Sequence, residues 1–284
     1  MHFDVFARTE VGCARERNED AFLVLDLATG TSGFMPSARP RMMAPPGTVV
    51  SVCDGMGGAA AGDLASKMAL ESLERVVRAR ASLQDVESVE ATFVDAVRTA
   101  NQEISAFAKA HPDKRGMGTT MTTAGLFGPD LVVIQVGDSR AYLKRGIMLQ
   151  QLTMDQNVVG QMIASGRITP DQARTVKQRN MLLEAIGVQP KVGPDLIRAQ
   201  LQPGDVLLLC SDGLTGPLDD RRVLDLMLQY EDPVRCCRAL TEAACAAGGP
   251  DNVTVAMARF HGTGQEPPVD PNTPIAFERR NTVA

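Results

Sequence analysis

Short apolar runs that end in polar turns recur along the chain and predict a protein rich in β-strands. Runs of four to eight apolar residues bounded by Gly, Pro, Asp or Asn are typical of buried strands. We therefore predict strands over residues 3–8, 21–27, 49–53, 119–127, 131–137, 140–144, 147–152, 205–210 and 253–260.

Apolar residues spaced three or four apart predict helices on either side of these strands. Residues 64–80 follow this spacing, and Asp63 is placed to cap that helix. Ser82 is placed to cap a second helix that extends to about residue 109. Further helices are predicted over 219–229 and 233–246. Because strands cluster between helical blocks instead of alternating with helices, the pattern favours an α+β fold with sheets covered by helices.

Three segments interrupt the pattern. Residues 28–47 are rich in Gly, Pro and Ser and are interpreted as an extended surface loop. Residues 153–190 are interpreted as a small inserted subdomain, with a short helix over 156–165 and another beginning at Thr169. From 263 onward the composition predicts a disordered tail, which leaves one folded domain over residues 1–262.

Composition narrows the class of protein. With 44% hydrophobic but only 4% aromatic residues and no Trp, we expect a large aliphatic core. The net charge of −5 and the lack of a basic run argue against nucleic acid as a partner. No run approaches the roughly 20 apolar residues of a membrane helix, and the N-terminus has no signal sequence. We expect a cytoplasmic monomer. The six cysteines include no Cys-x-x-Cys pair, so structural zinc and a disulfide framework are not expected.

Acidic residues adjoin strand ends or glycine turns at several places. A single Asp-Gly after a strand is most often a turn, but clustered carboxylates repel unless a cation binds them or their pKa values rise. Oxygen donors without His or Cys suit Mg²⁺ or Mn²⁺, and all three histidines lie elsewhere in the sequence. This argues against a zinc hydrolase and a Ser-His-Asp triad. Whether the acids converge in space is not given by the sequence. The candidates are Glu19, Asp20, Asp54, Asp138, Asp212 and Asp251.

Six short motifs follow one another along the chain, and several contain the candidate acids. They are Arg15-Glu16-Arg17-Asn18-Glu19-Asp20, Asp54-Gly55-Met56-Gly57-Gly58, Gly118-Thr119-Thr120, Gly137-Asp138-Ser139-Arg140, Ser211-Asp212-Gly213 and Asp251-Asn252. Lesser signatures begin at Thr153, Gly166 and Arg179. With these motifs in this order the chain resembles a bacterial member of the metal-dependent serine/threonine protein phosphatases, the type 2C family. The likeness covers roughly residues 3–260.

The resemblance implies a four-layer α-β-β-α sandwich with two Mn²⁺ or Mg²⁺ ions at one end. Asp54 would bridge the ions, and Asp212 and Asp251 would complete the first site. Glu19 and the carbonyl of Gly55 would hold the second ion.

Further roles are implied around these two sites. Asp20 would contact the second ion through water, and Asp138 would bind a third, weaker ion together with Asp212. Arg15 would grip the substrate phosphate, since its planar fork donates two parallel hydrogen bonds. The alternative for Arg15 is a surface charge like Arg17. Residues 153–190 would form a flap beside the site.

The chain departs from the family pattern at two positions. Met56 stands where many eukaryotic members carry a histidine proposed to protonate the leaving alkoxide, so we hypothesise that the third ion near Asp138 supplies this proton. Gln156 stands where relatives often carry His, and we expect it to affect substrate preference more than chemistry.

The resemblance implies an enzyme that hydrolyses phosphoserine and phosphothreonine in proteins through a hydroxide held between two metals. Its expected partners are phosphorylated proteins, and we expect it to oppose a bacterial Ser/Thr kinase. Two alternatives remain open. One is a partner-switching phosphatase acting on a small anti-sigma regulatory protein, and the other is an inactive phosphatase-like binding module.

Overall fold

The computed structural model describes most of the chain. For residues 41–43 it describes the backbone alone. The described residues are 2–33, 41–43, 47–57, 61–80, 83, 85–169, 172, 176, 181–262, 270 and 273–282.

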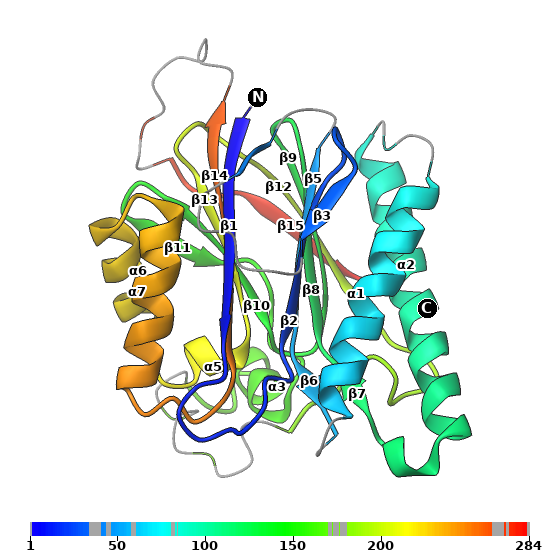
Figure 1. The fold of residues 1–284 in the computed structure, drawn as a ribbon. Coiled ribbons are helices and arrows are strands. Elements are labelled where there is room, and N and C mark those ends of the chain that lie inside the picture. Colours follow the sequence, from blue (N-terminus) through cyan, green and yellow to red (C-terminus); the bar gives the residue numbers. More distant parts are fainter. Residues whose placement is uncertain are drawn as a thin grey trace.

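Two antiparallel sheets pack face to face in the centre of the molecule (Figure 1). In the described part of the chain the first sheet has six strands and the second has seven. The first, in spatial order, consists of β11 (Met148–Gln151), β10 (Arg140–Arg145), β13 (Val206–Cys210), β14 (Val253–Gly262), β1 (His2–Glu10) and β4 (Arg41–Met43). The second consists of β15 (Phe277–Asn281), β12 (Asp195–Gln200), β9 (Asp130–Val136), β8 (Met121–Phe127), β5 (Thr48–Cys53), β2 (Ala21–Asp26) and β3 (Thr31–Gly33).

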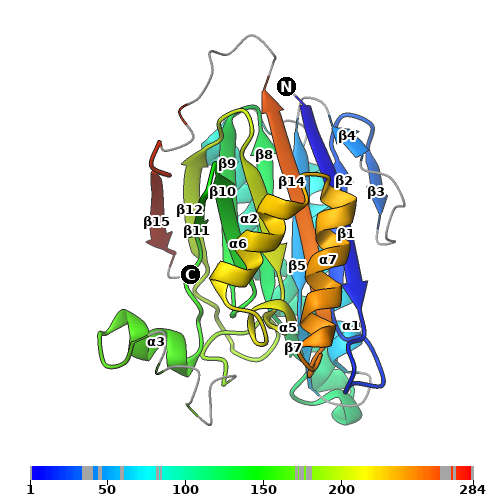
Figure 2. The ribbon, with the colours of Figure 1, turned by 90° about the vertical axis from the view of Figure 1, so that its left-hand side faces the viewer.

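Helices cover the outer face of each sheet (Figures 1 and 2). The long helices α1 (Gly62–Ala79) and α2 (Val86–Ala110) lie on the second sheet, and α6 (Asp220–Gln229) and α7 (Pro233–Ala246) lie on the first. In the described part of the chain the remaining elements are the helices α3 (Val158–Ala164) and α5 (Asp212–Thr215), a 3₁₀ turn (Pro112–Lys114) and a ribbon of β6 (Gly55–Met56) and β7 (Gly118–Thr119). The predicted four-layer α+β sandwich is confirmed.

Three apolar clusters hold the layers together. One lies between the sheets, one joins α1 and α2 to the second sheet, and one joins α6 and α7 to the first. The largest fully buried side chains are mainly aliphatic, with Tyr142 and Phe93 as the aromatic members. Because burial of apolar surface is the main favourable term in folding, these clusters fix the layers and so place the strand ends.

Several local predictions were wrong. Helix α1 has Ala61 at its N-cap without a side-chain bond, and Asp63 instead pairs with Lys67 inside the helix. Helix α2 is capped by Asp85, which accepts a bond from the backbone of Ser88 in a capping box. Ser82 lies outside the described residues.

Four strands of the two main sheets were missed. The expected loop over 28–47 contains β3 and β4, and the expected disordered tail contains β15, which pairs with β12. Strand β12 was not predicted at all. The second helix expected from Thr169 falls largely on residues outside the described part of the chain.

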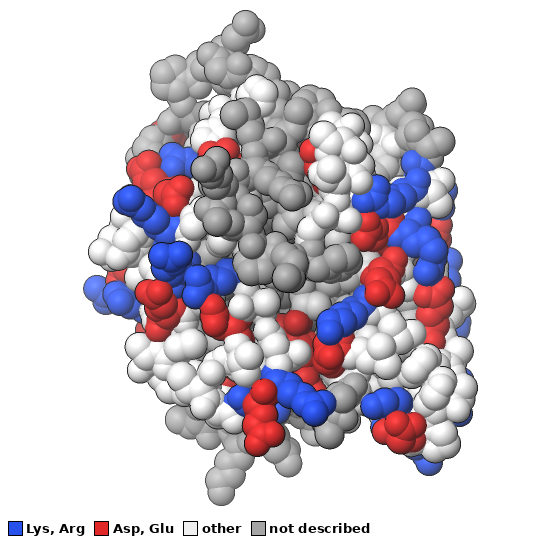
Figure 3. All heavy atoms as spheres, in the orientation of Figure 1, with Lys and Arg blue, Asp and Glu red and all other residues white. Residues whose placement is uncertain are grey.

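The surface carries mixed charge. On the face in Figure 3, Lys and Arg alternate with Asp and Glu in small groups, and neither sign forms a continuous field. Among the described residues, no helix has the length and apolar character needed to cross a membrane.

Candidate active site

The predicted acidic residues meet at one end of the sandwich, where β6, β7 and α5 lie in Figure 1. Their mutual proximity is clearest at Asp54, whose pKa is raised well above its usual value. Burial is the largest cause, and repulsion from Asp20, Asp212, Asp138 and Asp251 adds to it. Five carboxyl groups that lie on five different segments of the chain are therefore electrostatic neighbours.

Backbone and hydroxyl contacts fix Asp54 at the end of β5. Its backbone N–H donates to Thr120 Oγ1 (2.9 Å), and its carbonyl accepts from the backbone of Thr120 and from Thr119 Oγ1, each at 2.9 Å. The Thr120 hydroxyl in turn shares a buried 2.7 Å hydrogen bond with Ser139. Two of the sequence motifs thus act as supports that orient a third.

Gly55 allows two loops to approach more closely than any side chain would permit. A Cβ at Gly55 would lie 2.1 Å from the carbonyl oxygen of Gly62 and 2.6 Å from that of Glu19. The backbone N–H of Gly55 donates to the same Glu19 carbonyl, 3.2 Å away. The start of α1 is therefore packed directly against Gly55, and Glu19 is held beside them both. Gly58, at the end of the motif, lies outside the described residues.

Asp20 is the most enclosed acid of the N-terminal motif. Its side chain is buried and accepts a 2.7 Å hydrogen bond from the Ser211 hydroxyl. The same hydroxyl accepts from the backbone of Thr254 (3.0 Å), which joins the ends of β13 and β14. Burial raises the pKa of Asp20 to about 7, although bonds from Thr254 and Ser211 act in the opposite direction.

Asn252 ties the N-terminal loop to the loop before β14. Its side-chain oxygen accepts from the backbone of Glu19 (2.8 Å), and its amide donates to the carbonyls of Val11 and Arg17, both at 2.8 Å. These three bonds hold the loop between β1 and β2, residues 11–20, which we call the arginine loop. Asn252 therefore places both Glu19 and the neighbouring Asp251.

Arg15 points from the arginine loop to Asp251. Its Nη2 donates to Asp251 Oδ2 at 2.8 Å, and about half of its side chain (52%) is exposed. This hydrogen bond is the largest cause of a raised pKa for Arg15. Glu19 lies close to the same pair, and its own pKa is raised chiefly by burial. An anion that entered here would meet a guanidinium held by a carboxylate at the open edge of the site.

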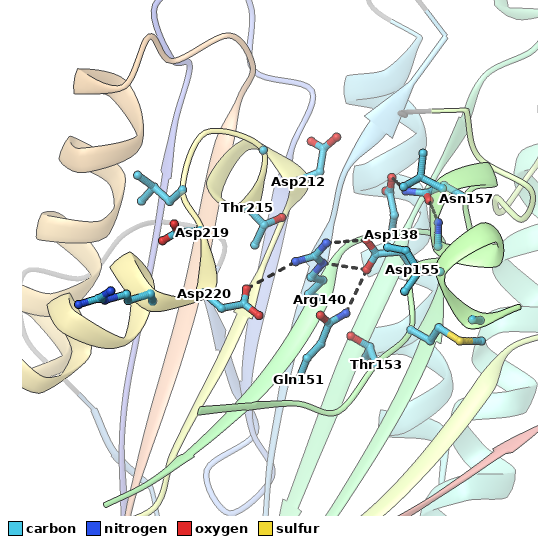
Figure 4. Close-up of a pocket in the computed structure, with 18 of the residues that line it drawn as sticks. Asp138, Arg140, Gln151, Thr153, Asp155, Asn157, Asp212, Thr215, Asp219 and Asp220 are labelled. Atoms are coloured by element: carbon cyan, nitrogen blue, oxygen red, sulfur yellow. Dashed lines mark hydrogen bonds and ion pairs between the residues drawn. The ribbon is translucent and has the colours of Figure 1, made fainter. Parts of the chain in front are cut away.

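Three successive residues at the start of the expected flap, residues 153–190, attach it to the opposite edge of the site, and Figure 4 shows Asp155 and Asn157 among them. Asp155 accepts two hydrogen bonds from Arg140, at 2.8 and 2.7 Å. Gln156 accepts from the backbone of Gly137 at 2.8 Å. Asn157 donates to Asp138 Oδ2 at 3.0 Å and, as the N-cap of α3, accepts from the backbone of Gly160 at 2.7 Å.

A pocket of about 630 Å³ opens between the flap helix α3 and the start of α6. It reaches Asp138 and Asp212 at one end, and Arg140, Asp155 and Asp220 line its wall (Figure 4). A chain that placed a phosphate among the acids would have room in this pocket for its neighbouring side chains.

The acids at this end of the sandwich are suited to hard cations, because they are negatively charged when ionised and offer only oxygen atoms as ligands. Burial raises the pKa of Asp138 to about 7 and also raises that of Asp212, and in both cases a neighbouring aspartate adds to the shift. As the described side chains are oriented, no group of three or more His, Cys, Asp or Glu would hold a metal ion. Asp212 instead lies within hydrogen-bonding reach of Asp54, and Asp251 is paired with Arg15. These two contacts would have to exchange for a cation to enter.

Several residues that hold the acids in place had no predicted role, although most of them lie inside the six motifs. Each of them has a hydroxyl or amide side chain and lies near an acid of the site. Side chains of these types can hydrogen-bond to a carboxylate or to neighbouring backbone groups and so hold them in position. The residues are Thr119, Thr120, Ser139, Ser211, Asn252 and, outside the six motifs, Asn157.

Known proteins are similar to this chain in sequence and in fold. The protein phosphatase 2C family model matches residues 44–244. Serine/threonine protein phosphatase PstP of Mycobacterium tuberculosis is 36% identical over 268 residues, which cover 93% of this chain and 46% of PstP. The chain thus spans about half the length of that relative. Serine/threonine phosphatase Stp of Listeria monocytogenes is 35% identical over 209 residues, 74% of this chain and 83% of Stp.

A solved structure extends the likeness to the fold. The catalytic domain of PstP in complex with two manganese ions superposes with a TM-score of 0.73 at 32% identity, over 91% of this chain and 98% of that domain. The family model alone matches well over half of the residues. The chain therefore belongs to the protein phosphatase 2C family.

Proposed function

We propose that the protein is a metal-dependent phosphatase that hydrolyses phosphoserine and phosphothreonine in proteins. The observation that carries the proposal is the gathering of Asp20, Asp54, Asp138, Asp212 and Asp251 at one end of the sandwich. Carboxyl groups so placed raise each other's pKa values unless cations neutralise them. The similarity to PstP and Stp, which are both named as serine/threonine phosphatases, supports the same activity.

The metal assignment follows the chemistry of the donors. Asp54 would bridge two Mn²⁺ or Mg²⁺ ions, with Asp212 and Asp251 on one and Glu19 and the Gly55 carbonyl on the other. The position of Asp54 among the other acids supports the bridging role, and the close approach of Gly55 to Glu19 supports the second group. The two manganese ions in the PstP catalytic domain support the count.

Two acids extend the assignment. Asp20 would act through water, since its carboxyl is buried and is already bonded to Ser211. Asp138 would bind a third ion with Asp212, and the two side chains line the same end of the pocket beside the flap. No His, Cys or Lys enters this donor set, which is the composition that Mg²⁺ and Mn²⁺ favour.

The chain's own residues orient the substrate. Arg15 would leave Asp251 and donate to two phosphate oxygens, while the pocket of about 630 Å³ receives the peptide. When bound, the cations supply a hydroxide nucleophile at neutral pH and offset charge on the phosphoryl group. Met56 has no group that transfers a proton, and we assign the proton of the leaving alkoxide to the Asp138 side of the site, where the third ion would be held. The expected partners are phosphoproteins, including a Ser/Thr kinase or its substrates.

The deciding experiment is hydrolysis of p-nitrophenyl phosphate with Mn²⁺, with and without EDTA. The wild type should lose its activity in EDTA, and Asp54→Asn should lose about 10³-fold in kcat because a central charge is removed. Asp225→Asn is the matched control, since Asp225 is exposed on α6 away from the site. An inactive wild type would overturn the proposed function, and full activity in Asp54→Asn would overturn the metal assignment.

A further inference from the structure

Cys13 and Cys245 are 232 positions apart in the sequence but touch in the structure. The Cys13 thiol donates to the carbonyl of Cys245, with 3.6 Å between Sγ and O. The two thiols also lie within hydrogen-bonding reach of each other. Cys13 belongs to the arginine loop, and Cys245 lies in the last turn of α7.

These two cysteines differ from the others in their access to solvent. Cys13 is exposed and Cys245 is partly exposed, while the remaining four are buried. The four are Cys53, Cys210, Cys236 and Cys237. Burial raises the pKa of the Cys245 thiol, so a soluble oxidant should react first at the open Cys13. A second thiol beside a reactive first one is the arrangement of redox-sensing pairs.

The backbone around the pair is built for close contact. The carbonyl of Gly249 accepts hydrogen bonds from the backbone of Cys13 (2.8 Å) and Ala14 (3.2 Å). A Cβ at Gly249 would lie 2.9 Å from both the backbone nitrogen and the Sγ of Cys13. Only glycine therefore lets the loop that follows α7 lie against the arginine loop.

The same contact leads directly to the candidate active site. Arg15 follows Cys13 by two residues, and Asp251 follows Gly249 by two residues. The side chains of Arg15 and Asp251 form the 2.8 Å ion pair. A covalent bond between Cys13 and Cys245 would thus fasten the base of the loop that carries Arg15.

We propose that Cys13 and Cys245 form a reversible intramolecular disulfide that locks the arginine loop against α7. With a peroxide as oxidant, the Cys13 thiolate attacks one oxygen and becomes a sulfenic acid, and hydroxide leaves. The Cys245 sulfur then attacks the sulfenic sulfur, the S–O bond breaks, and water leaves with the Cys245 proton. A dithiol restores both thiols by exchange.

The consequence for catalysis rests on the proposed function. Arg15 must leave Asp251 to bind phosphate, and a loop fastened in the present arrangement retains the ion pair. The oxidised protein should therefore bind phosphopeptide more weakly, with KM raised several-fold and kcat changed less. Reduction should reverse the effect.

Peptide mapping tests the bond independently of any activity. Trypsin cuts after Arg8, Arg15, Arg238 and Arg259, so Cys13 falls in the peptide 9–15 and Cys245 in the peptide 239–259. After treatment of the reduced protein with hydrogen peroxide, a non-reducing digest should contain these two peptides linked, with two hydrogens fewer than their sum. Their absence, or linkage to peptides of another molecule, would overturn the proposal.

Serine variants test the effect on the site. Cys13→Ser and Cys245→Ser each lack one partner, and both should keep the wild-type KM for a phosphothreonine peptide after peroxide. If the wild type forms the linked peptides without a rise in KM, the lock on Arg15 is overturned although the bond exists. If the reduced wild type hydrolyses no p-nitrophenyl phosphate, the proposed function fails and the peptide map still decides the disulfide.

Discussion

The two edges of the candidate active site are built in opposite ways. At the arginine-loop edge, Arg15 is about half exposed, and among the described residues its side chain forms one ion pair, to Asp251. At the flap edge, Asp138 is buried and bonded to Asn157, and Arg140 is fixed by Asp155 through two bonds. The Arg15 side chain is therefore held by a contact that can exchange, and the side chains at the flap edge are held by a network.

This difference suits the two edges to different functions, phosphate binding at Arg15 and fixed placement of an acid at Asp138. A side chain that has to receive a phosphate must be free to change partners, and an exposed ion pair contributes little to stability. A carboxylate that has to stay in place gains from neighbours whose positions are already fixed. We therefore expect substitution of Arg15 to affect mainly substrate binding, and substitutions at the flap edge to affect stability as well.

The largest effect should appear in metal-free protein as the pH is varied. Asp20 and Asp138 have a pKa of about 7 in the folded chain, against about 3.9 in an unfolded one. Between these values the folded state binds more protons, so its stability should fall as the pH rises from about 4 to about 7. At about 1.4 kcal/mol per pKa unit, the fall should reach a few kcal/mol. Thermal unfolding in EDTA at pH 5 and pH 8 measures it.

The same pH dependence of stability, measured in two variants, distinguishes the flap edge from the arginine-loop edge. Asp138→Asn should flatten the pH dependence, because it removes a buried carboxyl. Glu19→Gln should change it less, since Glu19 is only half-buried and Arg15 opposes the rise in its pKa. A larger flattening in Glu19→Gln would reverse our assignment of the rigid edge. Addition of Mn²⁺ should remove the dependence in the wild type.

Arg15→Ala should show the next largest effect. Two charge-assisted hydrogen bonds to phosphate are worth about 3 kcal/mol, so kcat/KM for a phosphopeptide should fall about 100-fold, mostly through KM. The free energy of unfolding should stay within about 0.5 kcal/mol of the wild type. Arg17→Ala is the matched control, and steady-state kinetics with urea unfolding measure both. Equal losses in the two variants would mean that Arg15 is a surface charge.

The sequence predicted this site better than it predicted the edges of the fold. Strand ends could be located because apolar runs stop at Asp54 and Asp212, and the helices α6 and α7 begin within about a residue of the expected positions. Strand β15 has the sequence Phe-Glu-Arg-Arg-Asn, which shows no strand pattern. It is held by pairing with β12 and by an ion pair from Arg280 to Glu90, two contacts distant in sequence.

The convergence of the acids in space could not be predicted from the sequence either. It depends on the order of strands in two sheets, in which β5 lies beside β8 and β13 beside β14. Asn157 carried no signal beyond its type, because its bond to Asp138 depends on how the flap folds back. Non-local contacts of this kind account for both the missed strands and the missed supporting residues.

A smaller effect is expected at Asn157, which joins the flap to Asp138. Asn157→Ala removes the cap of α3 and the donor to Asp138, and should cost about 1 kcal/mol in stability and about tenfold in kcat/KM for a phosphopeptide. Asn157→Asp keeps an acceptor for Gly160 but loses the donor, so it should lower turnover without loosening α3. Amide hydrogen exchange of α3 and peptide kinetics distinguish the two. Wild-type turnover in Asn157→Asp would show that the bond to Asp138 has no role.

The smallest effect tests how far the rigid edge extends into the C-terminal strand. Asn281 in β15 donates to Asp195 Oδ1 at 2.8 Å, and Asp195 Oδ2 accepts from Gln156 at 3.2 Å, so the strand braces the start of the flap. Asn281→Ala leaves the buried Asp195 one donor fewer, and should cost less than about 1 kcal/mol while it raises the phosphopeptide KM about twofold. Arg280→Ala, whose side chain pairs with Glu90 on the other face of β15, should match it in stability but leave KM unchanged. If both variants raise KM equally, the bracing runs through the strand as a whole and not through Asp195.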